Sequence, residues 1–80
     1  MSRARDVVEV IARTLAARPE EVRVSQIEHR GKTIIELFMA PGELGRVIGR
    51  QGRTATAIRT LASTAAEIDG AKVSVEFVDD

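Results

Sequence analysis

The sequence has 80 residues, no cysteine and a formal net charge of zero. A chain of this length forms one domain, spanning residues 1–80, with a core too small for a deep catalytic pocket. Without cysteine it has neither disulfides nor a cysteine-ligated metal, which is usual in the reducing cytoplasm. No apolar run approaches the roughly 20 residues of a membrane span, so we expect a cytoplasmic protein with no membrane contact.

The charges are distributed unevenly along the chain. From residue 44 to residue 66 the only charged side chains are four arginines: Arg46, Arg50, Arg53 and Arg59. This segment therefore carries +4, and the remainder, with eight basic and twelve acidic residues, carries −4. Screening at physiological salt confines the effect of a surface charge to about 8 Å, so a local basic patch favours an anionic partner even at zero net charge.

The N-terminal segment predicts an amphipathic helix over about residues 2–17, with Ser2 as N-cap and Pro19 beyond its end. Its apolar residues recur at helical spacing: Val7, Val8, Ile11 and Leu15. Residues 22–29 then predict a strand, in which Ile27 breaks the alternation and indicates a bulge or a twisted end.

Arg30-Gly31 is typical of a tight hairpin turn, and residues 32–39 after it predict a central strand that is partly buried on both faces. Residues 43–48 predict a short helix and residues 53–68 a longer one, followed by a strand that alternates Val73, Val75 and Phe77 with polar residues. The apolar face of the longer helix should contain Ala55, Ile58, Leu61, Ala62 and Ala65. The order α-β-β-α-α-β predicts an α+β fold, with a three-stranded sheet covered on one face by three helices.

Residues 49–52, Gly-Arg-Gln-Gly, connect the two later helices and are called the glycine loop below. Gly49 can end the short helix in the left-handed conformation, and Gly52 can lead the chain into the next helix. The first amides of that helix, around Arg53, Thr54 and Ala55, lack intrahelical acceptors and lie at the positive end of its dipole. Arg50 adds a guanidinium suited to phosphate, and Gln51 adds a neutral donor and acceptor. The loop is therefore a candidate backbone clamp for nucleic-acid phosphates.

Catalysis and cofactor binding have no supporting residues in this sequence. His29 is the only histidine, so no metal site or catalytic triad can be assembled around it. The glycine loop is not followed by the Gly-Lys-Ser/Thr of a P-loop, which argues against nucleotide hydrolysis. We expect a protein that is not an enzyme and needs no cofactor.

The order of elements, the corner Val-Ile-Gly-Arg-Gln-Gly-Arg and the following Thr-Ala-x-Ile-Arg resemble a type II KH domain. The chain is most similar to small bacterial single-KH proteins of the KhpA (YlqC) type, over nearly its whole length. The resemblance implies binding of about four nucleotides of single-stranded RNA, or sometimes DNA. It also implies homodimers, or association with a larger KhpB (Jag)-type KH/R3H partner, and links to regulatory RNA, as RNA chaperone or post-transcriptional regulator, and to cell shape.

By the same resemblance, the sugar-phosphate backbone is contacted by Gly49, Arg50, Gln51 and Gly52. Arg53, Thr54 and Arg46 are candidate neighbours of the phosphates, whereas Arg59 is more typical of a solvated surface charge. The bases would enter an aliphatic groove, for which the candidates, not separable from core residues by sequence, are Ile48, Ala55, Ile58, Ile35 and Leu37. Without Tyr or Trp, stacking of bases on aromatic rings is largely unavailable.

Two alternatives from other classes fit the same residues. A helix-hairpin-helix-like binder of duplex DNA also places a glycine corner on phosphates, but it does not require the flanking strands. A dimerisation or scaffold module would instead depend on a partner for its RNA contacts. Competition between duplex DNA and single-stranded RNA separates the first alternative, and sedimentation with and without RNA separates the second.

Overall fold

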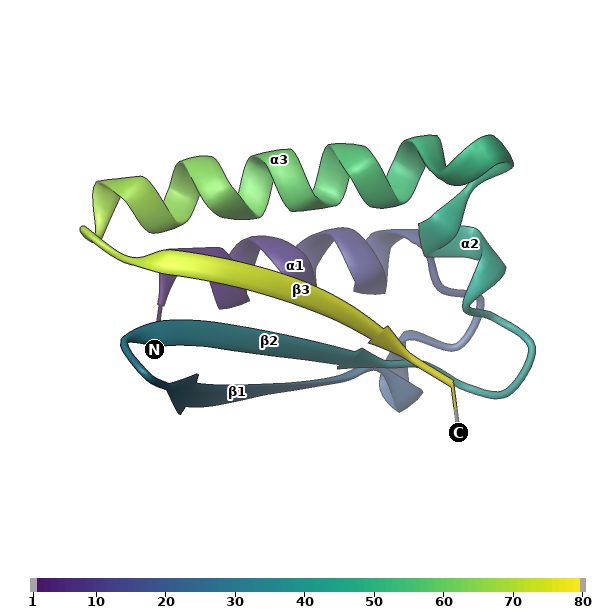
Figure 1. Cartoon of the computed structure of the whole chain (residues 1–80). Helices are drawn as coiled ribbons and strands as arrows, with labels where there is room; N and C mark the ends of the chain where they lie inside the picture. The colour runs from purple at the N-terminus through teal and green to yellow at the C-terminus, as the bar shows by residue number, and fades with distance from the viewer. Residues whose placement is uncertain (1, 80) are drawn as a thin grey trace.

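The computed structural model of the chain describes residues 2–79. Its elements are α1 (Arg3–Leu15), η1 (Pro19–Glu21), β1 (Arg23–His29), β2 (Lys32–Phe38), α2 (Gly45–Ile48), η2 (Arg50–Gly52), α3 (Arg53–Ile68) and β3 (Lys72–Val78), where η1 and η2 are short 3₁₀ turns. The sheet has the order β1-β2-β3, antiparallel between β1 and β2 and parallel between β2 and β3. The helices α1 and α3 lie side by side over one face of the sheet, and α2 packs against both near one end (Figure 1). The predicted α+β fold is confirmed.

The first helix begins as predicted and ends two residues early. The Ser2 hydroxyl accepts a hydrogen bond from the Arg5 amide at 3.1 Å, which caps the helix. The amides of Ala17 and Arg18 donate to the Glu43 carboxylate instead of continuing the helix, with Arg18 at 3.2 Å. The predicted start of the second helix is also wrong: α2 begins at Gly45 and not at residue 43.

Glu43 is a buried acid, only 5% exposed, between the end of α1 and the start of α2. Its carboxylate receives two amide hydrogen bonds and lies 3.6 Å from Arg18 Nε and 3.5 Å from Arg46 Nε. A buried carboxylate is tolerated when charged partners and amide donors surround it. It therefore joins the end of α1 to the segment that carries the glycine loop.

The hairpin between β1 and β2 turns at Arg30 and Gly31, both with positive φ (52° and 78°), as a type I′ turn requires. The strand pairing is continuous from Arg23 opposite Phe38 to His29 opposite Lys32, so the bulge expected near Ile27 is absent. Ile27 lies opposite Ile34 on the sheet face turned away from the helices and is 46% exposed. It breaks the apolar alternation because it belongs to the other face of the strand.

The core lies between β2 and the helices. Thr33, Ile35 and Leu37 of β2 are buried on the helix side, while the opposite-facing residues from Ile34 to Phe38 are half-buried, in agreement with the prediction. The buried line of α1 is Ala4, Val8 and Ala12, and the predicted Val7, Ile11 and Leu15 flank it.

Leu61 of α3 was predicted to be in the core but is 51% exposed, and Ala66 is buried in its place. At 3.6 residues per turn, Leu61 lies about 100° around the helix from the buried Ala62. The narrow alanine-rich stripe of α3 packs inward because small side chains let the helix approach closely. A leucine at its margin is therefore left facing outward.

Candidate nucleic-acid interface

The glycine loop has three residues with positive φ in four positions. Gly49 (φ 74°, ψ 175°) ends α2, its amide donating to Gly45 at 3.0 Å, and Gln51 (φ 59°) and Gly52 (φ 72°) turn the chain into α3. The prediction that Gly49 is left-handed is wrong in detail, because φ and ψ place it in a region that is essentially restricted to glycine. The left-handed residues are Gln51 and Gly52.

The side chain of Thr54 explains why position 49 is a glycine. A Cβ on Gly49 would lie 2.3 Å from Thr54 Oγ1 and 2.8 Å from Thr54 Cβ, both far inside contact distance. A Cβ on Gly52 would meet nothing within 4 Å. Thr54 itself is half-buried, and its amide lies in the first turn of α3.

The start of α3 offers amide donors with no acidic competitor. The helix has no side-chain cap and no acid in its first turn. The Arg53 amide already donates to the Arg50 carbonyl, so this predicted donor is occupied. The amides of Thr54 and Ala55 follow in the first turn, where intrahelical acceptors are missing. Two donors and the helix dipole therefore remain for an anion.

The arginines around the loop are held differently. Arg50 is exposed and, among residues 2–79, its side chain makes no hydrogen bond or ion pair. Arg53 Nη2 donates to Gln51 Oε1 at 3.1 Å, which leaves the Gln51 amide group available as a donor. Arg46 is paired with the buried Glu43 at 3.5 Å. Arg50 is therefore the arginine with most freedom to meet a phosphate.

A groove of about 400 Å³ begins directly beside the loop. Its lining residues come from α2, η2, α3 and β3: Ile48, Gln51, Gly52, Ala55, Thr56, Arg59 and Phe77. Of the apolar groove candidates, Ile48 and Ala55 line it. Ile35, Leu37 and Ile58 belong to the core, each no more than 1% exposed. The strand beside the groove is β3 and not β2, because β3 is the sheet edge next to α3.

Neither Phe77 nor Arg59 was predicted to lie in the groove, and the structure brings both to its wall. The Arg59 guanidinium lies 4.9 Å from the centre of the Phe77 ring, and its Nε donates to the Val75 carbonyl at 3.4 Å. Such a cation–π pair presents a flat, charged surface. The alternation of Val73, Val75 and Phe77 indicated only a core strand, and the parallel pairing that brings the end of β3 to the loop is not visible in local sequence.

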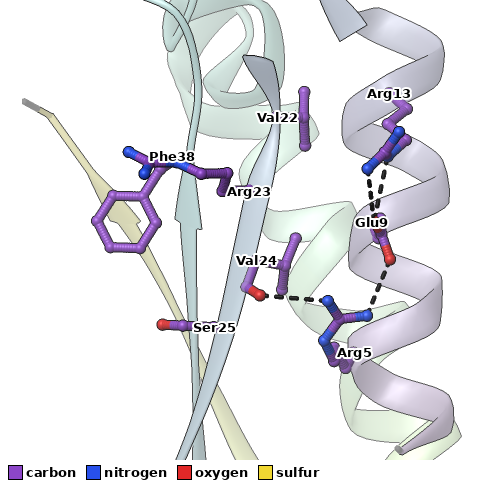
Figure 2. Close-up of a pocket in the computed structure, with 8 residues that line it drawn as sticks. All are labelled: Arg5, Glu9, Arg13, Val22, Arg23, Val24, Ser25 and Phe38. Carbon is purple, nitrogen blue, oxygen red and sulfur yellow. Dashed lines mark hydrogen bonds and ion pairs between the residues drawn. The ribbon is translucent and has the colours of Figure 1, made fainter. Parts of the chain in front are cut away.

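A second hollow, of about 640 Å³, lies between α1 and β1, away from the loop (Figure 2). Glu9 there accepts from Arg5 at 2.9 Å and pairs with Arg13 at 2.9 Å, and Arg5 also donates to the Val24 carbonyl at 3.3 Å. The hydrogen bond from Arg5 is the main cause that holds the pKa of the Glu9 carboxyl below its ordinary value. Arg5 and Arg13 are therefore already paired with groups of the chain itself.

We predict that Glu9→Gln lowers the free energy of unfolding by about 0.5–1 kcal/mol at pH 7, because two partly exposed i,i+4 ion pairs are lost. Since the folded pKa is depressed, the stabilisation is complete above the ordinary pKa of about 4.3 and is lost as pH falls through the lowered value. Urea unfolding at pH 7 and near pH 2 measures the difference. An equal difference at both pH values would contradict the ion-pair explanation.

The comparisons with known proteins identify the family of the chain. The sequence profile of the family described as KhpA/KhpB, KH domain, matches residues 5–77. The chain belongs to this KH-domain family. One member, named RNA-binding protein KhpA, from Clostridium perfringens, is 42% identical over 74 residues, covering 92% of this chain and 99% of the relative. Another of the same name, from Mycobacterium bovis, is 45% identical over 74 residues, covering 92% and 89%.

Among solved structures, Era from Aquifex aeolicus superposes with a TM-score of 0.64 at 24% identity, covering 96% of this chain and 31% of Era. At that identity the likeness shows the KH fold alone. No group of three or more potential metal ligands occurs within residues 2–79, and no helix there has the length and apolar character needed to cross a bilayer.

Proposed function

We propose that this chain binds single-stranded RNA, without catalysis, through the glycine loop and the groove beside it. The observation that carries the proposal is that the loop and the groove adjoin. Gln51 and Gly52 of the loop line the groove together with the cationic side chain of Arg59, and the start of α3 beside them has no side-chain cap. The relatives named RNA-binding protein KhpA support the ligand class. In the sequence, the flank from residue 44 to residue 66 has no acidic side chain to repel a polyanion.

In this mechanism Arg50 and the amides of Thr54 and Ala55 hold two or three phosphates, while the Gln51 amide group donates to a neighbouring oxygen. A base entering the groove packs on Ile48 and Ala55 and stacks on the Arg59 guanidinium, which lies over Phe77. Stacking on a guanidinium partly replaces the missing Tyr and Trp. With few contacts, we expect a Kd of order micromolar, about −8 kcal/mol.

The proposed role is that of a cytoplasmic RNA chaperone or post-transcriptional regulator. The chain would act as a homodimer or together with a KhpB (Jag)-type protein, because a weak binder gains affinity through a second copy or a partner. Leu61 and Ile68 favour such association, because these two apolar side chains of α3 are 51% and 68% exposed. Sedimentation velocity with and without RNA measures whether association occurs and whether RNA depends on it.

The test is NMR titration of the labelled chain with a four-nucleotide single-stranded RNA and, separately, with a short DNA duplex. We expect shifts at residues 48–59 and at Phe77 with RNA. If two or three phosphates are neutralised, log K falls with log salt at a slope of about −1.5 to −2. Absence of shifts would overturn the proposal in favour of a scaffold. Tighter binding of the duplex would favour a helix-hairpin-helix-like mode.

A further inference from the structure

The groove beside the glycine loop continues along α3 well past Phe77. A neighbouring hollow of about 390 Å³ shares Thr56 and Arg59 with it, and a third of about 330 Å³ shares Ser63 and Glu67 with the second. The third hollow ends at Lys32 and Lys72. The three hollows thus form one track along the outer side of α3, from the glycine loop to the opposite end of the sheet. We call it the α3 track.

The middle of the α3 track is polar and uncharged. Between Arg59 and Glu67 the helix has no charged residue, and hydroxyl side chains line the hollow: Thr56, Thr60, Ser63 and Thr64. Thr64 donates to the Thr60 carbonyl at 3.0 Å, and its oxygen keeps a lone pair for a further donor. Hydroxyls are common partners of phosphate and sugar oxygens, whereas an apolar protein partner would gain little from them.

The far end of the α3 track is positively charged. Lys32 and Lys72 are the only two lysines in the sequence, and they lie directly opposite each other in the parallel pairing of β2 and β3. Both are exposed, and within residues 2–79 neither forms an ion pair. The nearby Asp69 is already paired with Arg3 at 3.0 Å, which leaves Glu67 as the acidic residue lining the track.

The length of the track exceeds what four nucleotides need. The 16 residues of α3 span about 24 Å at 1.5 Å per residue. Four nucleotides at a stacked spacing of about 3.4 Å span about 14 Å. A strand that is held at the glycine loop and follows α3 therefore extends beyond the groove beside the loop, and it crosses the hydroxyl-lined middle before it reaches the lysines.

We propose that single-stranded RNA bound at the glycine loop continues along the α3 track and that Lys32 and Lys72 bind its phosphates at the far end. The binding site then accepts about seven nucleotides, the length of α3 divided by the stacked spacing. This inference rests on the proposed function. It assigns the two lysines a role that neither the loop nor the groove requires, and it makes Glu67 an unfavourable neighbour of the strand.

The experiment compares four- and eight-nucleotide RNAs of the same base composition by fluorescence anisotropy, using the whole chain. The double variant Lys32→Ala, Lys72→Ala is expected to bind the eight-nucleotide RNA about 5- to 10-fold more weakly and the four-nucleotide RNA unchanged. Its salt slope for the longer RNA should be about 1.4 smaller in magnitude, since two phosphate contacts are removed. Glu67→Gln should bind only the longer RNA more tightly, about 2- to 3-fold.

The charge-conserving variant Lys32→Arg, Lys72→Arg is the matched control and should bind both RNAs like the native chain. If the four-nucleotide RNA binds but the lysine variant loses nothing with the longer RNA, the track is wrong and the proposed function stands. Equal loss for both RNAs overturns the track as well, because the lysines would then act as a general charge. If neither RNA binds the native chain, both proposals fail together.

Discussion

Replacing Gly49 with alanine is expected to lower the free energy of unfolding by about 3 kcal/mol and to abolish detectable RNA binding. The backbone of Gly49, with φ 74° and ψ 175°, costs a non-glycine residue about 1–3 kcal/mol. The new methyl would also lie 2.8 Å from Thr54 Cβ, which is fixed to the backbone, so the first turn of α3 must shift. Because the amides of that turn are the proposed phosphate donors, stability and binding should fall together. Urea unfolding and RNA titration measure the two effects.

The control for this prediction is Gly52→Ala, at the other end of the same loop. Gly52 also has positive φ, but an added Cβ meets nothing within 4 Å, so the expected loss is only about 1 kcal/mol. In a double-mutant cycle, Thr54→Ala should recover part of the loss in Gly49→Ala, since it removes Oγ1 and keeps Cβ. Equal losses at the two glycines, or strict additivity with Thr54→Ala, would contradict the proposed clash.

The double variant Arg50→Asp, Gln51→Asp is expected to bind four-nucleotide RNA about 30- to 100-fold more weakly, which corresponds to about 2–3 kcal/mol. Both side chains are exposed, and aspartate tolerates the left-handed backbone of Gln51, so the fold should persist. Two new carboxylates would face the phosphates in place of a guanidinium and an amide. Titrations followed by anisotropy, with thermal unfolding of the same samples, measure binding and folding separately.

The matched control compares the single change Arg50→Asp with Arg30→Asp. Both arginines are exposed in tight turns, and both substitutions change the net charge equally, but Arg30 lies in the hairpin at the other end of β2. Only Arg50→Asp should weaken binding of the four-nucleotide RNA. If the two single variants lose the same affinity, the effect is one of net charge and the glycine loop has no special role.

The sequence predicted the elements well because each has a local cause. Ser2 caps α1, Arg30 and Gly31 form the hairpin turn, and the residues of β2 alternate as a strand requires. The errors in helix ends and faces have non-local causes. The carboxylate of Glu43, distant in the sequence, accepts the amide hydrogen bonds after α1. The inward face of α3 is formed by Ile58 and four alanines, and Leu61 lies outside it.

The candidate site was predicted in part for the same reason. The glycine loop is contiguous in sequence, so its two glycines, set between two predicted helices in a segment without acidic residues, indicated it. The groove combines residues about 20 positions apart, Ala55 on α3 and Phe77 on β3, through a parallel pairing that leaves no local pattern. Ile35 and Leu37 would line the groove only if β2 were the strand beside α3. The sheet order makes β2 the central strand and β3 the edge strand, so β3 takes that place.

The parallel pairing of β3 also affects the order in which the two parts of the candidate site form during folding. The glycine loop needs only α2 and the start of α3, whereas the groove wall with Phe77 and the Val75 carbonyl that holds Arg59 exists only after β3 has joined the sheet. Pairing of sequence-distant parallel strands is a slow step in folding. In the proposed binding mode, the phosphate-binding loop can therefore form before the groove that would accept bases.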